Sequence, residues 1–275
     1  MSADVRRYRV GVFDSGLGGL TVLAALERAL PTGVDFLYLG DTARVPYGGK
    51  SPVNIQRYTR QAAEFFVRHS CDAMVIACNS ASATALTHVQ ERYPALQPLG
   101  VITPASEQAC AAVATQPQAR IGVISTRSTE KSGAYVRELR MRLPAAQIVT
   151  RACPLFVPLV EEGWAQSPIT QSVIHEYLQG FVREPVDVMI LGCTHYPILR
   201  EAIRAYLPDS TRLLDSAEPT ALAVQARIAA DRDGAPSTTE IYATDVQESF
   251  RAEASRFLGR AVEQVHPVDL EGLSE

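Results

Sequence analysis

The chain has 275 residues, 47% hydrophobic and 20% charged, which is long enough to bury a core in one large or two modest domains. Its 26 basic and 30 acidic side chains give a formal net charge of −4, and no basic run marks a nucleic-acid-binding surface. No apolar run approaches the roughly 18 residues of a membrane span, and the N-terminus lacks a signal-peptide layout. We therefore expect a soluble cytoplasmic protein that binds neither nucleic acid nor a membrane.

The thiols and amines of the chain also limit its chemistry. An odd number of cysteines, five, with no C-x-x-C pair argues against a disulfide framework, and free thiols suit a reducing compartment. Lys50 and Lys131 are the only lysines, which matters because a pyridoxal-phosphate enzyme needs a lysine for its Schiff base.

The N-terminal region predicts a strand, a turn and a helix. Residues 8–13 (YRVGVF) are apolar and β-branched, and residues 20–30 have helical spacing. Between them, residues 14–19 (DSGLGG) form a glycine-rich turn of the kind that offers backbone N–H groups to an anion. Its spacing differs from the G-x-G-x-x-G fingerprint, so a tight, closely packed turn remains an alternative. Asp14, at the end of the strand, is either a helix cap or a functional acid.

A second predicted strand, residues 34–39, leads into a polar loop over residues 40–51 (GDTARVPYGGKS). Loops at strand ends often carry function in α/β proteins, although proline and glycine also fit ordinary turn chemistry here. After a helix predicted over 53–68, a third strand over 74–76 delivers Cys78, Asn79 and Ser80, and a helix over 81–93 follows.

This order of elements then repeats. Residues 120–128 (RIGVISTRS) resemble residues 9–16 (RVGVFDSG) at an offset of 111, which aligns Thr126 with Ser15. Residues 187–197 (DVMILGCTHYP) resemble residues 72–80 (DAMVIACNS), and residue 193 follows residue 78 by 115 positions. Both cysteines have Asp six residues earlier and Met four residues earlier. We predict two similar halves related by a pseudo-twofold axis.

The remaining elements alternate in the same way. We expect strands over 99–102, 147–151, 186–192, 211–214 and 240–244, and helices over 105–114, 133–143, 168–182, 198–206, 219–231 and 246–258. Alternating strands and helices predict an α/β fold: two similar domains with mainly parallel sheets flanked by helices. In such sheets ligands bind beyond the carboxyl ends of the strands, so we expect the active site between the domains.

Polar side chains collect at these strand ends: Asp14, Ser15, Tyr47, Cys78, Asn79, Ser80, Thr126, Glu161, Cys193, Thr194 and His195. If the halves face each other, the two thiols approach a common ligand from opposite sides. That arrangement suits stereochemical inversion, in which one thiolate removes a proton from Cα and the opposite thiol returns one to the other face. A free thiol has a pKa of about 8.5, within reach of neutral pH after modest tuning. Asp14, Glu161 and His195 are placed to orient and tune the sulfurs.

Four motifs, in order, resemble those of a known family: VFDSGLGGLTVL, GDTARVPYGGKS, ACNSASA and LGCTHYP. They are similar to the motifs of the glutamate racemases, within the cofactor-independent aspartate/glutamate racemase superfamily, over residues 12 to at least 258. The resemblance implies interconversion of L- and D-glutamate without a cofactor or metal, supplying D-glutamate for peptidoglycan, and a homodimer. It also implies a discontinuous first domain, residues 1–98 plus 215–275, and a second domain of residues 99–214.

The resemblance assigns roles to residues of this sequence. Cys78 and Cys193 match the two acid/base residues, and Asp14, His195 and Glu161 match the assisting groups, with Glu162 as the alternative to Glu161. The residues that it implies for substrate binding are Asp14, Ser15, Tyr47, Gly48, Asn79, Ser80, Thr126, Thr194 and His195. Ser80 stands where the family usually has threonine; the hydroxyl is kept, so the substrate contact should survive.

Other interpretations remain open. Cys78, Cys193 and His195 could be zinc ligands, although the closely paired ligands of structural zinc sites are missing. A non-catalytic amino-acid-binding protein could use the same scaffold, but it would not need both cysteines. An enzyme of the superfamily could act on another acid, although the tyrosine-glycine loop and the CTH triplet favour glutamate. Cys71, Cys110 and Cys153 are expected to be core residues.

Overall fold

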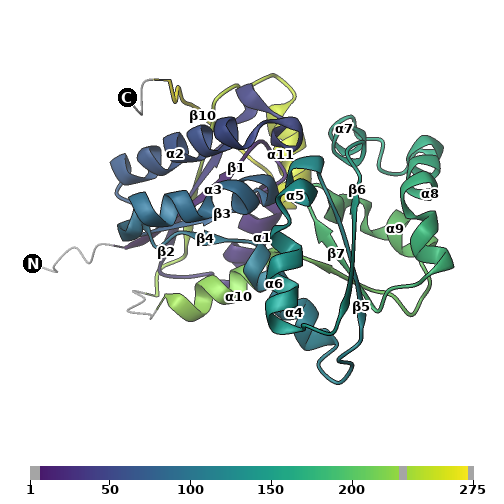
Figure 1. Cartoon of the computed structure of the whole chain (residues 1–275). Coiled ribbons are helices and arrows are strands. Elements are labelled where there is room, and N and C mark those ends of the chain that lie inside the picture. Colours follow the sequence, from purple (N-terminus) through teal and green to yellow (C-terminus); the bar gives the residue numbers. More distant parts are fainter. Residues whose placement is uncertain (1–6, 229–233, 272–275) are drawn as a thin grey trace, which may run out of the picture.

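The structure, a computed structural model, describes residues 7–228 and 234–271, which form two parallel β-sheets flanked by helices (Figure 1). The larger sheet contains β1 (Tyr8–Asp14), β2 (Val34–Gly40), β3 (Ala73–Ile76), β4 (Leu99–Gly100), β9 (Thr238–Ala243) and β10 (His266–Pro267). The smaller sheet contains β5 (Arg120–Ser125), β6 (Gln147–Ala152), β7 (Val188–Gly192) and β8 (Arg212–Asp215). The strand orders are β10-β9-β2-β1-β3-β4 and β6-β5-β7-β8. The predicted α/β class is confirmed.

The order β6-β5-β7-β8 in the smaller sheet repeats the order β2-β1-β3-β4 within the larger sheet, and the register repeats as well. Matched positions are Val12, Val75 and Leu99 across β1, β3 and β4, and Val123, Ile190 and Leu214 across β5, β7 and β8. The first pair of positions differs by 111 residues and the other two pairs by 115, which are the offsets of the sequence repeat. The repeat is therefore confirmed in the pairing of the strands. A pseudo-twofold axis between the halves stays a prediction.

The helices cover the faces of both sheets, so the central strands are apolar on both sides. Around the larger sheet lie α1 (Leu20–Ala29), α2 (Pro52–Arg68), α3 (Asn79–Arg92), α10 (Ala217–Arg227), α11 (Phe250–Leu258) and the 3-10 turns η1 (Thr42–Arg44), η2 (Tyr47–Gly49) and η3 (Pro94–Leu96). Around the smaller sheet lie α4 (Ile102–Ala112), α5 (Arg127–Ser132), α6 (Ala134–Arg142), α7 (Phe156–Glu161), α8 (Pro168–Arg183), η4 (Tyr196–Leu199) and α9 (Arg200–Tyr206).

Several predicted helix limits were wrong by a few residues. The helix predicted over 105–114 begins at Ile102, because Pro104 lies in its first turn, where a backbone N–H is not needed. The helix predicted over 246–258 begins only at Phe250. The helix predicted over 219–231 is α10, which begins at Ala217; residues 229–231 lie outside the described ranges.

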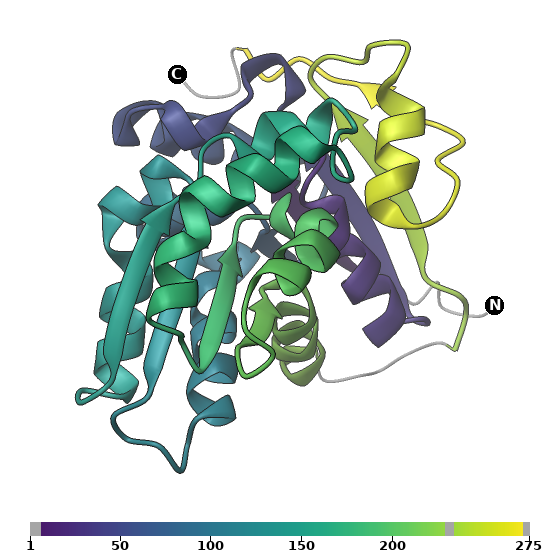
Figure 2. The same ribbon diagram turned by 90° about the vertical axis from the view of Figure 1, so that its right-hand side faces the viewer.

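After the smaller sheet the chain returns to the larger one. Strand β9 pairs with β2, and Figure 2 shows the C-terminal segment, in yellow, beside the N-terminal strands, in purple. The predicted domain limits stay a prediction, and Leu99 and Gly100, which they assign to the second domain, pair with β3 in the larger sheet. Among the residues that the structure describes, no helix is long and apolar enough to cross a membrane.

Candidate active site

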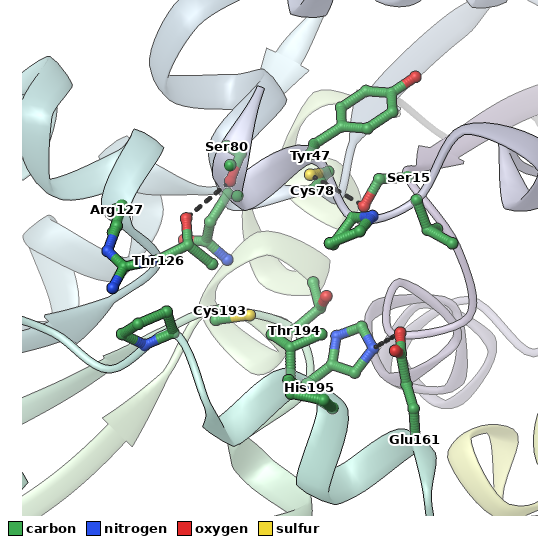
Figure 3. Close-up of a pocket in the computed structure, with 18 of the residues that line it drawn as sticks. Ser15, Tyr47, Cys78, Ser80, Thr126, Arg127, Glu161, Cys193, Thr194 and His195 are labelled. Atoms are coloured by element: carbon green, nitrogen blue, oxygen red, sulfur yellow. Dashed lines mark hydrogen bonds and ion pairs between the residues drawn. The ribbon is translucent and has the colours of Figure 1, made fainter. Parts of the chain in front are cut away.

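A cavity of about 530 Å³ lies between the two halves, at the carboxyl ends of strands from both sheets (Figure 3). Its walls include all but one of the predicted site residues: Ser15, Tyr47, Gly48, Cys78, Asn79, Ser80, Thr126, Glu161, Cys193, Thr194 and His195. The exception is Asp14, which is fully buried next to the cavity and does not line it. Figure 3 shows the sulfurs of Cys78 and Cys193 on opposite sides of the cavity.

Cys78 occupies the N-cap position of α3, just after β3. Its thiol donates a hydrogen bond to Ser15 Oγ across 3.6 Å. Burial raises the pKa of the Cys78 thiol to about 12; Asp14 and Cys193 add to the rise, and Ala81 and Ser15 oppose it. The expectation of a thiol close to neutral pH was therefore wrong for Cys78, because burial outweighs the helix terminus. Cys78 is therefore a protonated thiol at neutral pH.

Cys193 follows β7 directly and lies two residues before His195. Burial lowers the pKa of His195, but the interactions of the imidazole with Cys193 and Glu161 outweigh burial and raise the pKa to about 10. His195 Nε2 donates to Glu161 Oε1 at 3.0 Å. At neutral pH the imidazole is thus a cation between the Cys193 sulfur and the Glu161 carboxylate. Of the two adjacent acids, Glu161 is the one that bonds His195.

Asp14 ties the glycine-rich turn of one half to the other half. Its Oδ2 accepts the Gly16 N–H at 2.9 Å, and its Oδ1 accepts the Thr194 hydroxyl at 3.4 Å. Burial raises the pKa of Asp14, while nearby His195 and the donors Gly16, Gly19 and Thr194 oppose that rise. The carboxyl therefore positions the turn and Thr194, from a place next to the cavity.

The turn also needs glycine at position 18. A Cβ there would lie 2.3 Å from Thr194 Oγ1 and 2.6 Å from His195 Nδ1, which is closer than real atoms approach. The absence of a side chain at Gly18 is what allows Thr194 and His195 to pack against the turn. The turn is thus part of the support of the Cys193 side of the cavity.

Tyr47 is one of the residues that line the cavity. Its hydroxyl donates to Asp41, which is fully buried and also bonds Arg44 at 2.9 Å and Thr244 at 3.0 Å. The hydroxyl points away from the cavity (Figure 3). The loop therefore presents backbone groups of η2 to the cavity, and the Tyr47 ring anchors it.

Hydroxyl groups from the two halves meet on the opposite wall. Ser80 Oγ lies 2.9 Å from Thr126 Oγ1 and 3.3 Å from Thr129 Oγ1, and Thr126 accepts the Thr129 N–H as the N-cap of α5. The 14-residue helix α3 also begins at this wall. Helix N-termini and hydroxyl donors favour a bound carboxylate. The cavity thus combines two thiols with groups that bind anions.

Some lining residues were missed from the sequence. Arg127 lies at the cavity wall directly after Thr126, a position that could have been identified from the strand-end pattern. The apolar part of the wall comes from Val45, Pro46, Pro154, Leu155, Val157, Pro158 and Tyr177. Two residues outside the motifs hydrogen-bond Asn79: Tyr135 lies on helix α6, and Ser216 lies just before helix α10. Neither lysine lines the cavity, and no cluster of ligand-type side chains in the described ranges could hold a metal ion.

The family model and the known proteins to which the chain is similar are all racemases. The family model described as Asp/Glu/Hydantoin racemase matches residues 19–226. The glutamate racemase of Geobacter metallireducens is 40% identical over 270 residues, covering 97% of this chain and 98% of that protein. The structure of glutamate racemase from Francisella tularensis with D-glutamate has a TM-score of 0.85 and 33% identity, and that of the Thermus thermophilus glutamate racemase with beta-chloro-D-alanine has a TM-score of 0.84 and 42% identity. Each alignment covers 96% of this chain and 98% of the solved chain.

Proposed function

Because the chain belongs to the Asp/Glu/Hydantoin racemase family, we propose that it interconverts L- and D-glutamate by proton transfer between Cα and two thiols. The observation that carries this proposal is the placement of Cys78 and Cys193 on opposite sides of one cavity, at equivalent strand ends of the two sheets. A carbon held between them can lose a proton on one face and gain one on the other. That exchange inverts its configuration.

The two thiols have different surroundings. Cys78 is a protonated thiol at neutral pH, since burial raises its pKa to about 12. Cys193 lies against the imidazolium of His195, which would stabilise negative charge on its sulfur. Cys193 as thiolate removes the Cα proton of one enantiomer, and the bond electrons stay on Cα. The Cys78 thiol then protonates the opposite face, so the charge states of the two sulfurs are exchanged at the end of the turnover.

Burial strengthens this chemistry. The two cysteines are only 5% and 6% exposed, so a thiolate there lacks a full hydration shell, and charges interact strongly in such a site. The substrate carboxylates would be held by Ser15, Asn79, Ser80, Thr126 and Thr194, and by the backbone of Tyr47 and Gly48. Asp14 would act through the turn and Thr194, and Glu161 through His195.

The proposal also covers the setting of the reaction. A glutamate racemase would supply D-glutamate for peptidoglycan synthesis, in the cytoplasm, and we propose that it does so as a homodimer without a cofactor. The full-length similarity to glutamate racemases supports this role. Sedimentation of the purified protein would test the dimer.

The reaction itself is tested by incubating the purified protein with L-glutamate, without pyridoxal phosphate, and measuring D-glutamate with time. A parallel incubation uses L-aspartate. We expect D-glutamate to form and D-aspartate to form far more slowly. Absence of D-glutamate, or faster formation of D-aspartate, would show that the proposed substrate is wrong.

Gly18→Ala should impair the reaction by displacing Thr194 and His195, which its Cβ would contact. A shift of about 1 Å in catalytic groups can lower the rate about a hundredfold, and we expect a fall in kcat of that order. The matched control is Gly180→Ala on α8, where a Cβ would meet nothing within 4 Å. Wild-type kcat in Gly18→Ala would contradict the role given to the turn.

Tyr47→Phe should leave kcat nearly unchanged, because the lost hydroxyl bonds Asp41 and points away from the cavity. Buried Asp41 would lose the donor Tyr47 but keep Arg44 and Thr244 as partners. We therefore expect the free energy of unfolding to fall by about 1–3 kcal/mol. Steady-state kinetics and urea denaturation measure the two effects. A large loss of kcat with unchanged stability would instead place the hydroxyl in the reaction.

A further inference from the structure

A chain of buried hydrogen bonds holds the side chain of Asn79. The Tyr135 hydroxyl donates to Asn79 Oδ1 at 2.7 Å, and Asn79 Nδ2 donates to Ser216 Oγ at 3.5 Å. The three side chains are 3%, 2% and 3% exposed, in the order Tyr135, Asn79, Ser216. Of the three, only Asn79 lines the cavity.

The stronger of these bonds determines which way the amide faces. An asparagine amide presents an oxygen on one side and an NH₂ group on the other, and only the NH₂ group can donate to a carboxylate. A buried hydroxyl needs an acceptor for its proton, and among the described residues Asn79 Oδ1 is the acceptor of the Tyr135 proton. With Oδ1 occupied in this way, one N–H of Nδ2 reaches Ser216 and the second is left for a ligand.

The position of Tyr135 also joins the two halves. It lies on α6 beside the smaller sheet, whereas Asn79 begins α3 beside the larger one. Its ring packs against the end of β7, since a Cβ on Gly192 would lie 3.0 Å from Tyr135 Cε2. Burial raises the pKa of Tyr135, with Cys193 and Asp215 adding to the rise, so the hydroxyl remains a donor. One side chain thus contacts the residue before Cys193 and the residue after Cys78.

We infer that Tyr135 is a positioning residue that fixes the Asn79 amide so that an N–H group faces the substrate carboxylate. This inference rests on the proposed function for its kinetic consequence, but not for the hydrogen bond itself. Tyr135 does not line the cavity, so its effect on the substrate must pass through Asn79. Loss of the hydroxyl would allow the amide to turn and present its oxygen, which repels a carboxylate.

The kinetic test is a double-mutant cycle of Tyr135→Phe and Asn79→Ala, with Tyr196→Phe as control. Tyr196 is fully buried and its hydroxyl donates to the Cys153 carbonyl at 2.8 Å, so this control also removes one buried tyrosine hydroxyl. We expect Tyr135→Phe to lower kcat/KM about tenfold, mainly through a higher KM, and to have less than about a twofold effect when Asn79 is already alanine. Equal losses in both backgrounds, or a loss no larger than in Tyr196→Phe, would overturn the inference.

A second measurement does not depend on the reaction. The side-chain amide signals of Asn79 can be identified by NMR as the pair that disappears in Asn79→Ala. We expect this pair to shift in Tyr135→Phe and to stay in place in Tyr196→Phe; an unchanged pair in Tyr135→Phe would overturn the inference. If the wild-type protein fails to racemise glutamate, the proposed function is wrong, and the NMR result alone decides the role of Tyr135.

Discussion

Replacing either Cys78 or Cys193 with alanine is expected to lower the rate of glutamate racemisation by at least about a thousandfold, a loss typical of a removed general acid or base. Each thiol serves one face of Cα, so neither can substitute for the other. The loss should appear in both directions, because the thiol that donates in one direction is the base in the other. Initial rates from L-glutamate and from D-glutamate measure it.

Two other buried cysteines provide matched controls for this experiment. Cys71 lies in the core of the larger half and Cys153 in the core around the smaller sheet, and neither lines the cavity. Alanine at either position removes a buried thiol without touching the cavity, so racemisation should stay within about threefold of wild type. A thousandfold loss in a control, or full activity in either cavity mutant, would contradict the two-thiol mechanism.

The second large effect concerns the cation beside Cys193. His195→Asn removes the imidazolium that interacts electrostatically with Cys193, and we expect kcat to fall by about 10²- to 10³-fold. Glu161→Gln should lower kcat less, because the imidazole remains and only the carboxylate that accepts its proton is removed. Glu162→Gln is the control, since Glu162 is adjacent in sequence and does not bond His195. Equal losses in Glu161→Gln and Glu162→Gln would contradict the assignment.

The same contact predicts how stability depends on pH. The pKa of His195 rises from 6.5 to about 10 on folding, so the folded protein binds this proton more tightly than the unfolded chain does. The resulting stabilisation is complete below about pH 6.5 and is lost as the pH rises toward 10. Glu161→Gln removes one cause of the raised pKa of His195. In this variant, the stabilisation should therefore be lost completely at a lower pH than in the wild-type protein. Thermal unfolding between pH 6 and 10 tests this; parallel curves for the two proteins would contradict it.

Much of the fold could be predicted because its signals are local. The central strands are short apolar runs, each followed by a polar turn. Val12 pairs with Val75 in the larger sheet, and the residues 111 and 115 positions later, Val123 and Ile190, pair in the smaller sheet. The site residues could be predicted because parallel strands end at one edge of a sheet. Helix α5, with the sequence RSTEKS, escaped prediction because six mostly polar residues carry no apolar periodicity.

Properties that depend on tertiary surroundings could not be predicted. The raised pKa of the Cys78 thiol comes mainly from burial, which its strand-end position does not reveal. The outward direction of the Tyr47 hydroxyl depends on Asp41, and the contact of Tyr135 with Asn79 joins residues 56 positions apart. The contact of Tyr135 with Asn79 forms only when the two halves have packed together.

The most direct test of the two-thiol mechanism follows hydrogen at Cα in deuterated water. Starting from undeuterated L-glutamate at low conversion, the D-glutamate formed should carry deuterium at Cα, because its proton comes from the opposite thiol, which exchanges with solvent. The remaining L-glutamate should be undeuterated, and the reverse should hold when the reaction starts from D-glutamate. D-glutamate that retains the original proton, or deuterium entering the remaining L-glutamate as fast as D-glutamate forms, would indicate a single base and contradict transfer between Cys78 and Cys193.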